Sequence, residues 1–297
     1  MALIKVTFYV QDPVLSEALS NFLFEIGASG VSETVDKGVS QGLTAFFNEE
    51  EKPALDEKIR GYLKGLEEIS QASKALRWNW EKFTDENWAE KYKEFYKAQK
   101  LTHRFFLKPA WDEKTKVPSD MWPIVLDPGQ AFGTGLHAST KLSIHLLEDA
   151  ASFYPSVENI RLMDVGTGTG ILSMVANHLG FGEIHAIDND PISVEVAREN
   201  LKRNHCEKVQ LSGKPFNEFK EPFDVIVSNI LLETHLLLAK DYGRLLVPGG
   251  QLILSGLLGG QREALEQAVL REGFVPLVSY GLQEWAAYSY IRRNGKN

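Results

Sequence analysis

A short segment with glycine at every second position is the part of this sequence best suited to hold a ligand through its backbone. Asp164 to Gly170 reads DVGTGTG and directly follows an apolar run that predicts a strand over residues 160–165. Glycine lets the backbone approach a ligand without a Cβ clash and permits positive φ angles. Because ligands of α/β proteins bind at the carboxyl ends of parallel strands, this turn predicts a site for a nucleoside.

The spacing of the glycines distinguishes between classes of nucleoside. The dinucleotide fingerprint places glycines at its first, third and sixth positions. Here Gly166, Gly168 and Gly170 occupy the first, third and fifth positions, and Ile171 takes the sixth. This form, preceded by the acidic Asp164, is the methyltransferase form, so we predict S-adenosyl-L-methionine as the cofactor, bound in part by Gly166 and Gly168. For the glycine turn taken alone, a purely structural role is the alternative.

Asp188 ends the next predicted strand, 183–188, and lies 18 residues beyond Gly170. A carboxylate at this place can accept hydrogen bonds from both ribose hydroxyls of a nucleoside. The alternative role is an N-cap of the following helix, but Asp190 fits that role better because it directly precedes Pro191. We therefore predict that Asp188 binds the ribose.

Asn229 follows a third predicted strand, 223–228. Its amide offers both an acceptor and a donor, which could hold the methionine portion of the cofactor or a substrate amine. A turn-favouring asparagine after a strand is the alternative.

The segment from Leu126 to Thr140, LDPGQAFGTGLHAST, combines three glycines with hydroxyl groups and precedes a predicted helix over 140–147. Such a loop could close over the same end of the sheet, with Thr140 donating to the cofactor carboxylate near the helix start. A lone histidine such as His137 is more often structural than catalytic. We assign no catalytic base and no metal ligand.

Strands and helices alternate from residue 160 onward, which predicts an α/β fold with a mostly parallel, doubly wound sheet. The last two strands, 274–280 and 285–292, are close in sequence and are expected to pair antiparallel. Residues 1–80 predict a smaller α+β module with the order β-α-β-β-α-β of the ferredoxin-like arrangement, with helices over 13–26 and 53–66. The first 75 residues hold seven basic and twelve acidic residues, a net charge of −5. This excess suits capture of a basic protein, and a merely solvated surface is the alternative.

Residues 84–111 form a connector rich in lysine and aromatic residues. Trp88, Tyr92, Phe95 and Tyr96 fall at helical spacing. We favour a helix packed on its neighbour over a surface that stacks nucleic-acid bases. The expected domains are therefore a recognition domain at 1–80, a helical linker at 81–112 and a catalytic domain at 113–297.

The composition limits the class of protein. The chain has 297 residues, is 43% hydrophobic and carries a net charge of −8. An acidic chain favours a basic protein or a small molecule over naked nucleic acid. Cys206 is the only cysteine, so no intramolecular disulfide can form, and neither a secretion signal nor a membrane-spanning run is evident. We expect a cytoplasmic monomer without membrane or direct nucleic-acid contacts.

Four segments together resemble the PrmA family, the methyltransferases of bacterial large-subunit ribosomal protein eleven. They are 127–140, 164–170, 186–191 and 228–231, and the similarity runs from about Asn87 to the C-terminus. The resemblance implies a class I S-adenosylmethionine-dependent methyltransferase with a Rossmann-like, seven-stranded sheet. It implies cofactor contacts at Thr140, Gly166, Asp188 and Asn229, and methylation, up to trimethylation, of lysine and N-terminal amines of that ribosomal protein. The N-terminal domain would recognise the ribosomal protein, joined by a flexible helical linker.

The sequence departs from the family pattern at two places. Leu136 and Ala138 flank His137, where the family usually has Thr and Pro. After Asn229-Ile230-Leu231 the family tends toward small residues and Pro, whereas this chain has Leu232-Glu233-Thr234-His235. Other functions to be tested are methylation of another protein lysine or of RNA, and cofactor sensing without catalysis.

Overall fold

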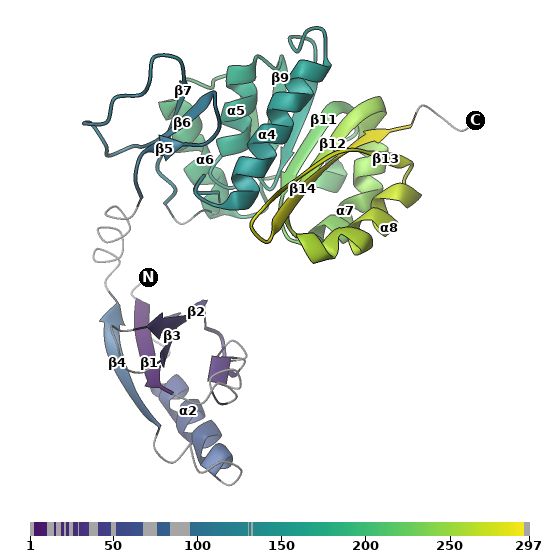
Figure 1. The fold of residues 1–297 in the computed structure, drawn as a ribbon. Helices are drawn as coiled ribbons and strands as arrows, with labels where there is room; N and C mark the ends of the chain where they lie inside the picture. Colours follow the sequence, from purple (N-terminus) through teal and green to yellow (C-terminus); the bar gives the residue numbers. More distant parts are fainter. Residues whose placement is uncertain are drawn as a thin grey trace. The chain divides into compact units, whose positions relative to one another are not determined.

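The computed structural model describes residues 3–10, 15, 19–20, 22–23, 26–28, 30–35, 41–48, 52–67, 76–83, 96–129, 131 and 133–293. Two compact units divide the chain, Met1–Tyr96 and Lys97–Asn297 (Figure 1). Each unit has its own hydrophobic core and is described by itself.

The first unit is built on a four-stranded antiparallel sheet with the order β2-β3-β1-β4. Its strands are β1 (Leu3–Tyr9), β2 (Gly30–Val35), β3 (Gln41–Asn48) and β4 (Arg77–Phe83), and its described helix is α2 (Lys52–Glu67). This is the strand order of the ferredoxin-like arrangement, so the predicted fold of the first unit is confirmed. The predicted helix over 13–26 falls largely outside the described residues.

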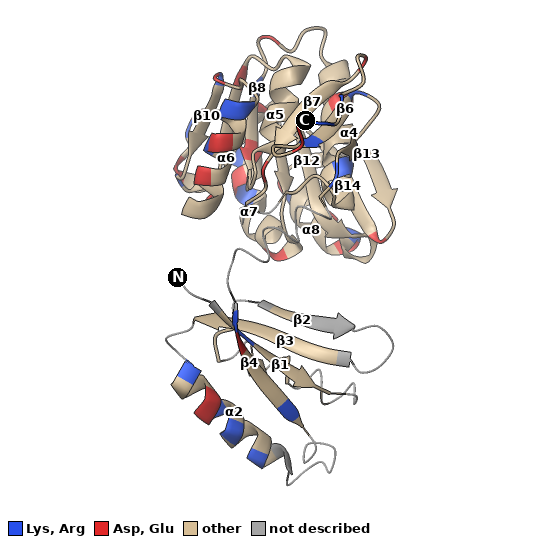
Figure 2. Cartoon of the chain, turned by 90° about the vertical axis from the view of Figure 1, so that its left-hand side faces the viewer, with Lys and Arg blue, Asp and Glu red and all other residues tan. Residues whose placement is uncertain are grey.

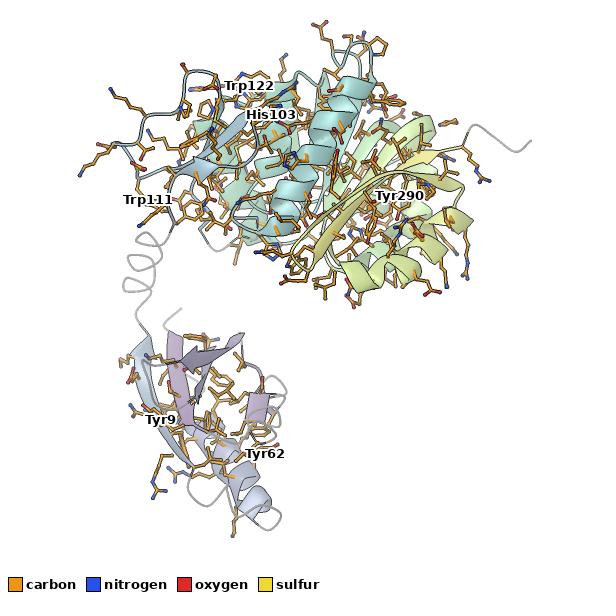
Figure 3. All side chains as sticks on the ribbon, viewed as in Figure 1. Tyr9, Tyr62, His103, Trp111, Trp122 and Tyr290 are labelled. Carbon is orange, nitrogen blue, oxygen red and sulfur yellow. The ribbon has the colours of Figure 1, made fainter. Side chains whose placement is uncertain are left out.

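Side chains of β1 alternate between the two faces of the sheet, so every second one lies in the core. Ile4, Val6 and Phe8 are at most 2% exposed, and they pack in one cluster with the buried face of α2. Phe22 stacks on Tyr62 of α2 with ring centroids 3.8 Å apart. Tyr62 is labelled in Figure 3. These contacts fix one face of the sheet against its helix.

Asp56 of α2 joins the helix to β4. The indole N–H groups of Trp78 and Trp80 donate to its Oδ1 at 3.2 and 2.9 Å, and Arg60 donates to Oδ2 at 2.8 Å. Although burial raises the pKa of Asp56, the hydrogen bonds from Trp80, Arg60 and Trp78 together lower it below its usual value. The ionised carboxylate is therefore the form that holds helix and strand together.

Charges of both signs lie along α2 (Figure 2). Of the twelve acidic residues counted in the sequence, only Asp56 and Glu57 have side chains that the structure describes. The expected acidic surface of this unit stays a prediction.

The second unit contains a seven-stranded sheet with the order β10-β9-β8-β11-β12-β14-β13. Five neighbouring strands are parallel, and the last two strands of the chain are antiparallel, as the sequence predicts. The seven strands, in chain order, are β8 (Arg161–Val165), β9 (Glu183–Ile187), β10 (Val209–Ser212), β11 (Phe223–Asn229), β12 (Leu246–Leu258), β13 (Phe274–Leu282) and β14 (Trp285–Arg292).

Helices connect and cover these strands (Figure 1). They are α4 (Ala138–Phe153), α5 (Ile171–Leu179), α6 (Pro191–Arg203), α7 (Leu232–Leu245) and α8 (Arg262–Arg271), with short 3₁₀ turns at Phe216–Glu218 and Gly259–Gln261. The strand order reverses between β8 and β11, so right-handed crossovers place α5 and α7 on opposite faces of the sheet. This reversal is a topological switch point, and it places the ends of β8 and β11 side by side.

One strand of this sheet is longer than its sequence suggests. A turn is expected at 248–250 because of the sequence Pro-Gly-Gly, yet β12 runs from Leu246 to Leu258 without interruption. The register with β11 shifts between Phe223 and Val225, so the extra residues form an irregularity within the strand. A Cβ on Gly250 would lie 2.8 Å from the carbonyl oxygen of Asp224, so only glycine fits at this position without a shift of the backbone.

Part of the segment 81–112, for which a helical linker is expected, forms strands instead. Residues 81–83 belong to β4, and a three-stranded sheet begins the second unit with β5 (Gln99–Lys100), β6 (Phe105–Pro109) and β7 (Trp122–Leu126). Phe105 is fully buried, and its ring centroid lies 5.4 Å from that of Trp122. Trp122 is labelled in Figure 3. The rest of the expected linker helix, 84–95, lies outside the described residues.

No helix in the described part of the chain is both long and apolar enough to cross a membrane.

Candidate active site

The glycine turn lies where β8 meets α5, at the switch point. Gly166, Gly168 and Gly170 have φ angles of 74°, 54° and 84°, a region that side chains rarely adopt. The N–H groups of Gly166 and Thr167 both donate to the Ile187 carbonyl at 2.9 Å, which ties the turn to the end of β9. A Cβ on Gly166 would lie 2.6 Å from Ile230 Cγ2. The turn therefore requires glycine for its conformation and for its close approach to β11.

Asp188 lies directly after β9 and faces this turn. Its Oδ2 accepts from Gly168 N at 2.9 Å, and its Oδ1 accepts from Asp190 N at 3.0 Å. The N-cap of α6 is Asp190, which accepts from the backbone N–H groups of Ile192 and Ser193. Each Asp188 oxygen has a second lone pair, so the carboxylate keeps capacity for two further donors.

A pocket of about 440 Å³ opens beside these residues. Of the predicted site residues, Gly166 and Asp188 line it, together with Val165, Ile187, Asn189, Lys214, Pro215, Phe216, Asn217, Ile230, Thr234, Leu237, Leu238 and Asp241. Phe216 and Asn217 were not predicted from the sequence. The available signal was their position shortly after β10, another parallel strand that ends at the same edge of the sheet.

Asn229 and Thr140 form a second group at the same edge, next to the end of β11. They do not line the 440 Å³ pocket, but Asn229 Nδ2 donates to Thr140 Oγ1 at 3.4 Å. Thr140 is fully buried and Asn229 is 7% exposed, and no group of the described protein donates to the buried Asn229 Oδ1. A buried acceptor without a donor is costly, so this oxygen marks a place for an external donor.

The loop before α4 is tied to the glycine turn by hydrogen bonds. Thr169 Oγ1 donates to the Gly133 carbonyl at 2.6 Å. The buried side chain of Asn200 in α6 donates to the carbonyls of Asp127 and Thr169 at 2.9 and 3.1 Å. The loop thus lies against the same end of the sheet, as predicted, and Asn200 is a supporting residue that we did not identify from the sequence. Residues 130 and 132 of the loop are outside the described part.

Asp164 lies beneath the glycine turn and is fully buried. Thr167 Oγ1 and Ser173 Oγ each donate to its Oδ2 at 2.7 Å, while its Oδ1 has no hydrogen-bond partner. Burial is the main cause that raises the pKa of Asp164 to about 6, and the nearby charge of Asp188 adds to it, against the two hydroxyl donors. Asp164 supports the turn and is not exposed to substrate.

The raised pKa of Asp164 predicts a pH dependence of stability. A carboxyl group whose pKa is higher in the folded state stabilises the fold when protonated, so its contribution is complete below 3.8 and is lost as pH rises through about 6. We expect Asp164→Asn to remove this dependence, which amounts to about 3 kcal/mol of unfolding free energy. Urea unfolding of both proteins between pH 4 and 8 measures it. If the unfolding free energy of the two proteins changed with pH in the same way, Asp164 would not be the source of the dependence.

The departure at Leu232-His235 places a histidine in the core near the site. His235 is fully buried, its Nε2 donates to the Ser255 carbonyl at 2.9 Å, and its Nδ1 accepts from Tyr242 at 3.1 Å. Burial lowers the pKa of His235 to about 4, so the ring is neutral near neutral pH. The Ser255 carbonyl also accepts from Ile230 N at 3.2 Å. His235 therefore supports the segment after Asn229 and is not available as a base.

These groups fit S-adenosyl-L-methionine. The pocket combines a carboxylate with free lone pairs and apolar walls, which suits a ribose and an adenine. Gly166 lines the pocket without a side chain that could cover it, and the unpaired Asn229 Oδ1 suits an ammonium donor. Among the described residues, no group of three or more His, Cys, Asp or Glu could hold a metal ion.

Comparison with known proteins decides the family. A family model for PrmA, ribosomal protein L11 methyltransferase, matches residues 4–293. The chain belongs to the PrmA family. Two relatives named ribosomal protein L11 methyltransferase agree. The one from Exiguobacterium sibiricum is 32% identical and covers 91% of this chain and 93% of its own. The one from Anoxybacillus flavithermus is 34% identical, and the match covers 92% of this chain and 94% of the relative.

A solved structure supports the same placement. The ribosomal protein L11 methylase from Lactobacillus delbrueckii subsp. bulgaricus is 30% identical, with a TM-score of 0.61, and its full length matches 67% of this chain. The resemblance drawn from the four sequence segments is thus confirmed, as is the class I methyltransferase fold. Membership of the PrmA family makes the chain a protein methyltransferase, which disfavours cofactor sensing alone.

Proposed function

We propose that the chain transfers methyl groups from S-adenosyl-L-methionine to lysine side chains and the N-terminal amine of ribosomal protein L11, up to the trimethylated state. The match of the PrmA family model to residues 4–293 is the observation that carries this proposal. The arrangement at the ends of β8, β9 and β11 supports the choice of cofactor, because it joins a glycine turn, a carboxylate and an unpaired amide oxygen.

Each predicted site residue has a role in this proposal. Asp188 accepts from the ribose hydroxyls, and the backbone at Gly166 and Gly168 lies along the cofactor. Thr140 Oγ1 accepts from Asn229, so its own hydrogen can be donated to the cofactor carboxylate, while Asn229 Oδ1 accepts from the cofactor ammonium. When bound, the cofactor supplies an activated methyl group on a sulfonium.

Adenine requires an apolar surface beside the ribose site. Phe216 is 6% exposed and lines the pocket together with Ile187 and Ile230. Asn217 offers a polar edge next to them, so we assign this part of the pocket to the base.

The substrate amine must be neutral before its lone pair can attack. A lysine amine has a reference pKa of about 10.4, and desolvation at the site would lower it. Among the described side chains near the site, Asp164 and His235 are sealed in the core, and His137 uses its Nδ1 within the protein. Asp241 of the pocket lining is paired with Arg244 at 2.8 Å. We therefore propose that positioning supplies most of the rate and that water takes the proton.

We assign recognition of the ribosomal protein to the first unit. Its ferredoxin-like sheet belongs to a separate compact unit, and the described residues that line the pocket lie in the second unit. This division leaves the first unit free to bind a folded substrate while the second performs the transfer.

Transfer of a radiolabelled methyl group tests the proposed function. The protein is incubated with labelled S-adenosyl-L-methionine and either purified L11, other large-subunit proteins or ribosomal RNA. We expect label in L11, and mass spectrometry of its peptides should find mono-, di- and trimethylated amines. Label confined to RNA, or to a different protein, would replace this function with one of the two alternative methyltransferase activities.

A further inference from the structure

The first turn of α4 is capped by a histidine, which is an unusual residue for this role because Ser, Thr, Asp and Asn predominate at N-caps. His137 has extended backbone angles of −69° and 141°, and Ser139 N donates to its Nδ1 at 3.3 Å. Its carbonyl accepts from Thr140 N at 3.1 Å and from Lys141 N at 3.3 Å. His137 therefore satisfies three backbone N–H groups at the start of the helix.

The cap also fixes the chemical state of the ring. A backbone N–H can only donate, so Nδ1 must be the acceptor, and the ring proton belongs on Nε2. The Ser139 hydroxyl lies 2.7 Å from the same nitrogen. On its other side the ring meets Trp285 edge-on, with centroids 4.3 Å apart. Protonation of Nδ1 would break the cap, so this arrangement does not suit a general base.

Two residues in the first turn of α4, Ser139 and Thr140, connect the cap to the candidate site. The Ser139 carbonyl accepts from Ser255 Oγ at 3.0 Å, which ties the start of α4 to β12. Thr140 is fully buried and accepts from Asn229, whose Oδ1 is buried without a partner. The cap therefore determines where the Thr140 hydroxyl lies relative to this open acceptor.

We propose that His137 is a positioning residue, whose imidazole caps α4 and thereby holds Thr140 against Asn229 to form the methionine end of the cofactor site. The proposal rests on the proposed use of S-adenosyl-L-methionine. The adenosine end, with Asp188 and Phe216, belongs to other elements and does not depend on the cap.

Titration calorimetry with two ligands tests this role. Adenosine lacks the methionine portion and reports the Asp188 end alone, so it also serves as an internal check that each variant is folded. We expect His137→Ala to weaken binding of S-adenosyl-L-methionine about tenfold, because ligand binding must then reorder an uncapped first turn. Adenosine affinity should change less than about twofold, since the cap does not reach its site.

His137→Asn is the matched control, because an asparagine oxygen is a good N-cap acceptor but has no imidazole chemistry. We expect it to restore S-adenosyl-L-methionine affinity and to leave the pH profile of methyl transfer to L11 parallel to that of the unmodified protein. Equal losses for both ligands, or no loss in His137→Ala, would overturn the positioning role. The positioning role would also be overturned if His137→Asn bound S-adenosyl-L-methionine normally but lost one limb of the pH profile of methyl transfer. The imidazole would then take part in the chemical step. If the unmodified protein failed to bind S-adenosyl-L-methionine, the proposed function itself would fail instead.

Discussion

Asp188→Ala is expected to weaken binding of S-adenosyl-L-methionine by about 100-fold or more. A hydrogen bond to a charged group contributes about 1.5–3 kcal/mol, and the proposal gives Asp188 two ribose hydroxyls. The substitution also removes the acceptor of Gly168 N, so the glycine turn loses a support at the same time. Titration calorimetry on the purified protein measures the affinity.

Asp190→Ala is the matched control for this prediction. Asp190 lies two residues away and caps α6 through Ile192 and Ser193, but it does not line the pocket. Its loss should lower stability through the missing cap and leave cofactor affinity nearly unchanged. A 2′-deoxyribose analogue of the cofactor should bind the unmodified protein more weakly, and Asp188→Ala should weaken its binding less than it weakens binding of the cofactor, because only one ribose hydroxyl remains for Asp188. Unchanged affinity in Asp188→Ala would remove this residue from the site.

Removal of residues 1–96 is expected to lower methylation of L11 by at least 100-fold while leaving cofactor affinity unchanged. The second unit has its own core, and all the described residues that line the pocket belong to it, so we expect it to bind S-adenosyl-L-methionine without the first unit. Docking through a tethered domain raises the local concentration of substrate amines, and its loss costs about 10²- to 10⁴-fold in apparent affinity. Initial rates at low L11 concentration measure the effect.

A short, unmodified L11 peptide that contains one of the lysines to be methylated distinguishes docking of the substrate from methyl transfer. Such a peptide should be methylated at similar, low rates by the full chain and by the truncated chain, because neither can exploit the docking surface of folded L11. Full activity of the truncated chain on folded L11 would show that recognition belongs to the second unit.

Local signals in the sequence were sufficient for several elements of the second unit. Gly170 and Gly180 flank α5 in left-handed conformations, so the bounds of this helix follow from the residue types at its two ends. Asp190 and Pro191 indicated the start of α6 in the sequence. An N-cap side chain and the fixed φ of proline affect only the first turn of a helix, so both can be identified locally. These features need no information from distant residues.

Other elements could not be found in this way. The three-stranded sheet of β5, β6 and β7 replaced part of an expected helix, because Phe105 is buried against Trp122 rather than by a helical neighbour. The Pro-Gly-Gly sequence before residue 251 resembled a turn, and the pairing of Leu246 and Gln251 with β11 on either side of it includes it in β12. In both cases the partner strand decided the conformation.

The sequence by itself determined the chemical nature of this protein. Its glycine spacing, the acid at 188 and the loop before Thr140 were sufficient to predict a methyltransferase fold and its family, because these motifs depend on residue type at fixed short spacing. Only the tertiary structure joined Thr140 to Asn229, which are 89 residues apart, and left one amide oxygen without a donor. It also brought Phe216 and Asn217 to the pocket. Such contacts depend on strand order and on the reversal between β8 and β11, which a local pattern does not encode.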